Sequence, residues 1–204
     1  MTTTFAKAAT LAAWGITIAL ASSQLPGSKI VRSYKQTGGD IVVQEFTRDE
    51  ADGTHTNQFF VSSTKTPNER RFLFQHHRGA TLLISPDASH IAINHYASST
   101  DGVVIVFERV KDLEYRELIG DDVIRKKALH AASQSLGHKT DINFDHLYVD
   151  CIAWSAGSSA LLVRLSGHNE GALEDWYCIF DIKTKAVSLD LSLMNKGTCI
   201  RRGE

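Results

Sequence analysis

Residues 80–117 read ATLLISPDASHIAINHYASSTDGVVIVFERVKDLEYRE, and this pattern indicates four consecutive β-strands. Residues 90–96 alternate between two faces, which is the period of a half-buried strand. Residues 103–107 form a continuous β-branched and aromatic run, as is typical of an inner strand. Pro86 pre-sets φ in the turn before residue 90, and Asp87 can bond its own backbone there. The stretch therefore predicts an antiparallel meander with strands at 80–84, 90–96, 103–107 and 113–118.

A similar pattern recurs seventy residues along the chain (155 − 85 = 70). The segment SPDASHIAI at 85–93 aligns with SAGSSALLV at 155–163. Before the turn, LLI at 82–84 matches IAW at 152–154, and after it VFE at 106–108 matches IFD at 179–181. Recurrence of one supersecondary unit predicts a repeat architecture.

The segment SPDASHIAIN, residues 85–94, resembles the S-P-D-G-K-x-I-A turn of TolB-like and other WD40-like propeller blades. The resemblance covers about one blade well and a second blade loosely. It implies that the four-stranded meanders are propeller-like blades.

The rest of the chain predicts more strands and one helix. Asp121 and Asp122 favour a helix start, and Gly137 stands where a C-terminal cap is expected. We therefore predict an all-β fold of propeller-like antiparallel four-stranded meanders, about three units, with one helix inserted near 121–137. Closed propellers have four or more blades, so three outcomes are open. The chain forms an incomplete propeller, rolls into a sandwich or barrel, or completes itself against another chain. The strands predicted outside the central stretch are 29–35, 40–47, 56–63, 71–76, 147–154, 159–165, 176–182 and 186–191.

The N-terminal residues predict export. Lys7 precedes an apolar run at 8–21 that ends in the small-residue pattern of a signal-peptidase site. We predict a signal peptide at 1–21, a linker at 22–28, a single β-meander domain at 29–204, and a periplasmic or secreted location. The alternative is an uncleaved membrane anchor, although the run is shorter than the roughly 20 residues that span a bilayer.

The composition argues against broad electrostatic partners. The formal net charge is -1, which disfavours general affinity for nucleic acid or for an anionic membrane. No cofactor motif is present, so we expect no cofactor.

Three cysteines are present, at 151, 178 and 199. In an oxidising compartment two of them can pair, and the sequence favours Cys178 with Cys199, which ties the tail to the sheet. Three single pairings are possible, and three reduced thiols are the alternative.

Several patterns point to chemistry only weakly. His76, His90 and His95 are the alternative metal or enzyme site, but His90 and His95 are an odd number of residues apart and point to opposite faces of one strand. The acidic run at 49–53 is oxygen-rich, but a hairpin turn explains it as well as calcium binding does. The segment at 157–159 lacks the G-x-S-x-G pattern of a hydrolase elbow.

The leading functional interpretation is a non-enzymatic module that binds another protein, with an inhibitor or immunity-type protein as one version. Its contact site is predicted in the polar loop at 168–176, since exposed loops and aromatic residues favour recognition. Trp176 and Tyr177 alternate in direction, so one of them faces away from the core. The alternatives are a small extracytoplasmic enzyme built on the histidines and carboxylates, or a structural subunit that completes a propeller by oligomerising. The predicted contact residues are His168, Glu170, Glu174, Asp175 and Trp176.

Overall fold

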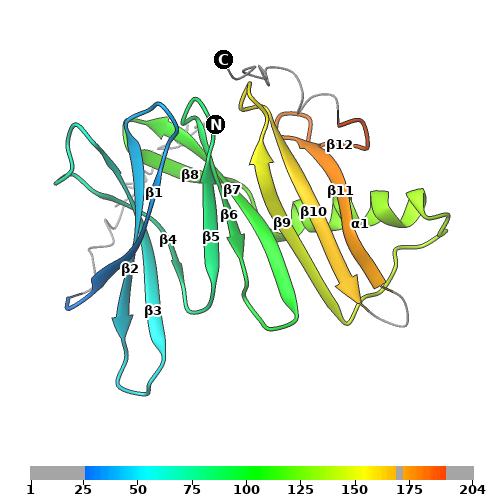
Figure 1. Ribbon diagram of the computed structural model, residues 1–204, viewed down its shortest axis with the longest axis horizontal. Coiled ribbons are helices and arrows are strands. Elements are labelled where there is room, and N and C mark those ends of the chain that lie inside the picture. The colour runs from blue at the N-terminus through cyan, green and yellow to red at the C-terminus, as the bar shows by residue number, and fades with distance from the viewer. Residues whose placement is uncertain (1–25, 169–171, 192–204) are drawn as a thin grey trace, which may run out of the picture.

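A computed structural model describes residues 26–168 and 172–191 (Figure 1). The fold is mainly β, as the sequence predicted, and the described residues contain one helix. The predicted signal peptide at 1–21 and Cys199 lie outside the described residues and stay predictions. The elements are β1 (Lys29–Lys35), β2 (Ile41–Asp49), β3 (His55–Ser63), β4 (Arg71–His76), β5 (Ala80–Ile84), β6 (His90–His95), β7 (Asp101–Lys111), β8 (Glu114–Ile119), α1 (Asp121–Ser135), β9 (His146–Trp154), β10 (Ala160–His168), β11 (Ala172–Asp181) and β12 (Val187–Ser188).

The strands form three antiparallel groups in chain order. The first sheet is β1–β4, with each strand paired to the next. The second meander is β5–β8 and the third meander is β9–β12, again with neighbours paired in order. Figure 1 shows the three groups side by side, with α1 behind the third.

The second and third meanders open with turns of the same geometry. In the second, Ser85 N–H donates to the His90 carbonyl at 2.9 Å, and Ala88 has φ 57°. In the third, Ser155 N–H donates to the Ala160 carbonyl at 2.8 Å, and Ser158 has φ 58°. The two aligned segments therefore have the same local structure, although only the first carries proline and aspartate.

A short parallel contact joins the second and third meanders, which a purely antiparallel pattern did not anticipate. Asp101 and Gly102 of β7 pair with Leu147 and Tyr148 of β9 in parallel. A parallel pair requires a crossover connection, and α1 supplies it. The helix ends as the sequence predicted, with Gly137 in the left-handed region at φ 82°.

Two apolar clusters fill the spaces between the three groups. One lies between the first sheet and the second meander and includes Phe59, Ile91 and Ile93. The other lies between the second meander, the third meander and α1, and includes Val104 and Val163. Both faces of the second meander are therefore covered, because it is sandwiched between its neighbours.

No helix within residues 26–168 and 172–191 is long and apolar enough to cross a lipid bilayer.

Candidate functional site

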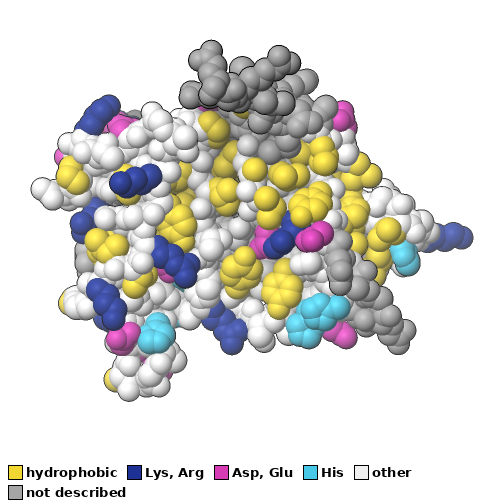
Figure 2. Space-filling model, in the orientation of Figure 1, with side chains coloured by type: hydrophobic (Ala, Val, Ile, Leu, Met, Phe, Trp, Pro, Cys, Tyr) yellow, Lys and Arg dark blue, Asp and Glu magenta, His cyan; other side chains and the backbone are white. Residues whose placement is uncertain are grey.

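The strands β9–β11 have one face that is partly exposed. Alternate side chains, such as Val149 and Val163, point into the cluster that α1 covers, so their neighbours point the opposite way. We call this opposite side the outer face. Ile152 is 41% exposed and Tyr177 is 39% exposed on it. Figure 2 shows mostly hydrophobic side chains over β9–β11, with a small charged group among them. The outer face comprises Tyr148, Asp150, Ile152, Leu162, Arg164, Tyr177 and Ile179, of which Asp150 and Ile179 are buried.

A buried carboxylate fixes the centre of the outer face. Asp150 accepts hydrogen bonds from the Tyr96 hydroxyl at 2.8 Å and from Arg164 Nη2 at 2.8 Å. Burial, and then the bond to Asp150, raise the pKa of Tyr96 to about 12, and the same carboxylate raises the pKa of Arg164. The guanidinium is therefore held in one position at the surface, with Asp175 3.6 Å from its other nitrogen.

Sequence reasoning missed this cluster, although a signal was present. A single charged residue interrupts each of two apolar strands, in LYVDCIAW at 147–154 and in LLVRLS at 161–166. A charge in such a strand requires a partner, because burying it unpaired is costly. Asp150 and Arg164 lie directly opposite each other in the β9–β10 register.

The predicted contact loop at 168–176 is largely a strand. β11 begins at Ala172, and Leu173 pairs with Gly167, so cross-strand pairing overrides the polar composition of this segment. Asp175 is exposed at the rim of the outer face. Glu170 and the side chain of Glu174 lie outside the described residues.

The aromatic residues of β11 divide between its two faces. Trp176 packs on the cluster beside α1, and its Nε1 donates to Ser135 Oγ at 3.2 Å. Tyr177 is therefore the residue that faces outward. His168 stacks on His146 at the edge of the outer face, with ring centroids 4.8 Å apart.

The structure separates the three histidines of the alternative site. His76 and His95 line one small hollow, with ring centroids 6.4 Å apart, whereas His90 stacks on Trp154. The His76 side chain is 1% exposed, and its Nε2 is 3.5 Å from a Glu45 carboxylate oxygen. Burial lowers the pKa of His90 and of His95. Within the described parts of the chain, no three histidine, cysteine or acidic side chains gather as a metal site.

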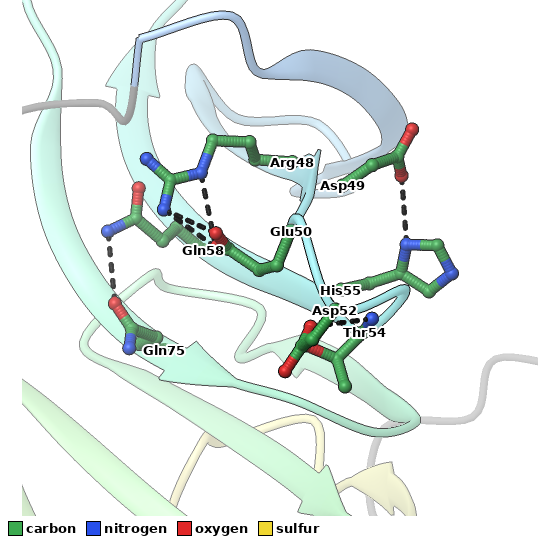
Figure 3. A network of polar contacts seen from close by, with 8 residues as sticks. All are labelled: Arg48, Asp49, Glu50, Asp52, Thr54, His55, Gln58 and Gln75. Carbon is green, nitrogen blue, oxygen red and sulfur yellow. Dashed lines mark hydrogen bonds and ion pairs between the residues drawn. The ribbon is translucent and has the colours of Figure 1, made fainter.

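The acidic hairpin between β2 and β3 uses its carboxylates internally (Figure 3). Glu50 accepts from Arg48, with the shortest distance 2.7 Å, and this bond lowers the pKa of Glu50. Asp52 accepts from Thr54, and Asp49 lies 2.8 Å from His55. Each of the three carboxylates interacts with a different partner within the hairpin. A hairpin turn therefore accounts for all three acidic residues.

A cavity of about 480 Å³ lies between the two matching turns. Its lining carries both signs of charge, from Asp87 and Glu108 on one side and Lys183 and Lys185 on the other. Asp87 is fixed by its own turn, since the Ser89 hydroxyl donates to it at 2.6 Å and the Ser85 hydroxyl at 2.8 Å. Partial burial acts to raise the pKa of Asp87, but the hydrogen bonds outweigh it and lower the pKa to about 2.

This shift predicts a stability difference that depends on pH. The pKa of Asp87 is about 2 in the folded chain and about 3.9 in an unfolded one, so its ionised form stabilises the fold above pH ~4. That contribution is lost as the pH falls from about 4 towards 2. Urea unfolding of the wild type and of Asp87→Asn, at pH 6 and at pH 2.5, measures it. We expect the stability advantage of the wild type to shrink at the lower pH, and an advantage equal at both values would contradict the assignment.

The two described cysteines are buried beside α1. Cys151 and Cys178 form no disulfide among the described residues, and burial raises the pKa of Cys178 to about 12 and that of Cys151 further. Neither thiol is therefore a reactive nucleophile near neutral pH. The Cys178–Cys199 pairing stays a prediction.

Comparison with known proteins identifies no family for the chain. No protein-family model matches the chain, and no curated protein matches it. Among solved structures, an acylaminoacyl peptidase from Pyrococcus horikoshii aligns with 78% of this chain at 14% sequence identity and a TM-score of 0.46. The alignment covers 24% of the peptidase, so the chain spans about a quarter of its length. This likeness assigns neither a fold family nor an activity to the chain.

Proposed function

We propose that this chain is an exported, non-enzymatic protein-binding module and that the outer face of the third meander is its contact surface. The supporting observation is a mainly apolar sheet face that is partly exposed around a fixed ion pair. Ile152 and Tyr177 are about two-fifths exposed there, whereas Cys151 and Cys178, which lie next to them on the same strands and point the other way, are buried. Monomeric proteins seldom leave such a contiguous apolar surface without a use.

The composition of the outer face also supports protein recognition. Tyrosine and arginine are enriched at the energetic centres of protein interfaces. Arg164 is already held by Asp150, so binding would cost little of its side-chain entropy. The exposed charge of Asp175 at the rim adds a polar border of the kind that surrounds apolar contact centres.

A propeller-like arrangement is part of the proposal. Each meander stacks face to face on its neighbour, and the two turns share the same hydrogen bonds. Stacked meanders of this kind are the building plan of propeller blades. Export rests on the predicted signal peptide at 1–21, which gives a periplasmic or secreted location.

The enzyme alternative is less well supported by the histidine geometry. The His76 side chain is almost fully buried. Its ring packs against the Phe59 ring at a centroid distance of 5.0 Å, and its Nδ1 hydrogen-bonds a backbone carbonyl. A substrate has no access to that imidazole. His90 lies in a different hollow from His76 and His95, and this separation favours the binding proposal over a site built from all three histidines.

Replacement of Tyr177 by aspartate will weaken protein binding by about 10-fold or more, because it places a charge at the centre of an apolar contact. The immobilised wild type and variant are compared for stoichiometric capture of proteins from the periplasmic or extracellular fraction. Val110→Asp is the matched control, since Val110 is 51% exposed but lies near the β7–β8 turn. Capture that is unchanged by Tyr177→Asp would remove the outer face as the contact surface.

A further inference from the structure

The cavity between the two matching turns is built from both meanders. Its volume is about 480 Å³, which lies within the range of pockets that hold small organic molecules. The second meander contributes Asp87 and His90 to the lining, and the third contributes Ser158, Lys183 and Lys185. The Asp87 N–H donates to Ser158 Oγ at 3.2 Å, so a hydrogen bond joins the two turns. None of the described residues that line this cavity belongs to the outer face.

One wall of the cavity carries a fixed negative charge. Asp87 Oδ1 accepts from the hydroxyls of Ser85 and Ser89, at 2.8 and 2.6 Å, and from the Ser89 N–H at 2.8 Å. These donors are neutral, so they hold the carboxylate in position without balancing its charge. Glu108 lines the same wall, but an Arg116 nitrogen lies 2.6 Å from its carboxylate and balances it. Asp87 is therefore the negative group that a ligand meets on this wall.

The opposite wall carries the positive charges of Lys183 and Lys185. Both lysines are exposed, and both lie on the turn between β11 and β12. Asp181 closes this turn, since its side chain accepts from the Thr184 N–H at 2.7 Å and its carbonyl accepts from the Lys185 N–H at 2.9 Å. The bonds from Thr184, and to a smaller extent the charge of Lys183, lower the pKa of Asp181. The turn thus fixes where the two ammonium groups are attached.

The rest of the lining is uncharged. Leu118 and Ile182 supply apolar surface, and Ile182 is buried. Burial lowers the pKa of His90, so its imidazole is neutral at pH 7. The His90 ring is stacked on Trp154 with the centroids 5.6 Å apart, and this contact holds the ring in the wall. A molecule in the cavity therefore meets neutral groups between the two charged walls.

The third meander leaves space where the second has its aspartate. Gly157 occupies the position in SAGSS, residues 155–159, that Asp87 occupies in SPDAS, residues 85–89. Among the described residues, a Cβ at Gly157 would meet Ser159 Oγ alone, at 3.9 Å. The two turns therefore present one carboxylate to the cavity and not two, which leaves the lysine wall free of a facing acid from its own turn.

We propose that this cavity binds a small zwitterion, whose ammonium group pairs with Asp87 and whose carboxylate pairs with Lys183 and Lys185. The two walls select a ligand that carries both charges, because a simple anion would lie beside Asp87 and a simple cation beside the lysines. The volume admits a molecule of the size of an amino acid or a dipeptide. This activity goes beyond the proposed function, since the cavity and the outer face share no lining residue.

Isothermal titration calorimetry of the purified chain tests the proposal with matched probes. ε-Aminocaproate carries both charges, hexylamine carries the ammonium group alone, and hexanoate carries the carboxylate alone. γ-Aminobutyrate is a shorter zwitterion and tests the separation of the charges. We expect the better zwitterion to bind about 10-fold or more tightly than either single-charge probe, because each missing end forfeits a hydrogen bond between charged groups.

Variants assign the two ends of the ligand. Asp87→Asn is expected to lower the affinity for ε-aminocaproate to that for hexanoate, and the double variant Lys183→Gln/Lys185→Gln to lower it to that for hexylamine. Asp112→Asn is the matched control, since Asp112 is another exposed turn aspartate of the second meander and lies outside the cavity lining. Its affinity for ε-aminocaproate stays at the wild-type value. Circular dichroism verifies the fold of each variant.

Gly157→Asp tests the cavity without disturbing the Asp87 turn. The matching turn accepts aspartate at this position, so the variant is expected to fold. Its added carboxylate repels the carboxylate of the ligand, and we expect the affinity for ε-aminocaproate to fall about 10-fold. An unchanged affinity would place the ligand elsewhere and overturn the site.

The probes also decide the class of ligand. Hexanoate that binds as tightly as ε-aminocaproate would make the cavity a plain anion site, and hexylamine that does so would make it a plain cation site. Either result overturns the proposal, as does the absence of binding by both zwitterions up to about 10 mM. Tyr177→Asp leaves zwitterion binding unchanged, so failure here and failure of the proposed function are seen in separate measurements.

Discussion

Replacement of Phe59 by alanine will lower the free energy of unfolding by about 3–5 kcal/mol. The Phe59 ring is fully buried in the cluster between the first sheet and the second meander. It contacts the Tyr34 ring at a centroid distance of 6.0 Å and the His76 ring at 5.0 Å. Truncation removes these contacts and leaves a cavity that the two sheets cannot close, because both are held by their own backbone ladders. Chemical unfolding followed by circular dichroism measures the loss.

Phe72→Ala provides the matched control within the same sheet. This side chain is a phenylalanine on β4, but it lies at the surface and contacts the Phe60 ring only edge-on at 5.8 Å. We expect its removal to cost about 1 kcal/mol or less. Equal losses for the two variants would mean that the space between the first sheet and the second meander is not the tightly packed core described above.

Replacement of Asn94 by leucine will lower the free energy of unfolding by about 2–5 kcal/mol, because two buried backbone groups lose their partner. Asn94 bonds both the N–H and the carbonyl of Cys151 from the neighbouring meander. Leucine has nearly the same size but bonds neither group. Each buried polar group left unpaired costs roughly 1–3 kcal/mol. Thermal and urea unfolding of the variant measure the effect.

Thr81→Val separates the two roles of the Asn94 amide. The Asn94 nitrogen also lies 3.3 Å from the Thr81 hydroxyl, within the same meander. Removing that hydroxyl leaves both bonds to Cys151 intact, so we expect a loss of about 1 kcal/mol or less. A loss for Thr81→Val as large as for Asn94→Leu would show that the amide matters within its own meander and not as the link to β9.

Local chemistry explains what could be predicted from the sequence. The alternation of Ile91 and Ile93 with Ala92 and Asn94 predicted a strand with two distinct faces, and the structure places them in separate surroundings. The helix at 121–137 was predicted from its end signals and is observed at Asp121–Ser135. The strand and the helix both depend on interactions between side chains that are close in sequence. These local preferences do not depend on how the rest of the chain folds.

Residues 168–176 were predicted to form a loop because they are rich in polar residues and glycine. In the structure, however, Leu173 and Asp175 belong to β11. Pairing with β10 supplies hydrogen bonds that the composition alone does not reveal. Likewise, His90 and Trp154 are distant in sequence, and only packing brings their rings to a centroid distance of 5.6 Å.

The sequence by itself determined the strand pattern, the two matching turns and the position of the helix, because periodicity and turn chemistry act over a few residues. Only the tertiary structure decided which faces are covered and which remains exposed. The cluster of Tyr96, Asp150 and Arg164 joins residues 54 and 14 positions apart. The contact between Tyr96 and Asp150 forms only when the second and third meanders stack, and the free energy that selects the stacking comes from burying both faces of the second meander. The outer face is the place where that stacking ends within the described chain.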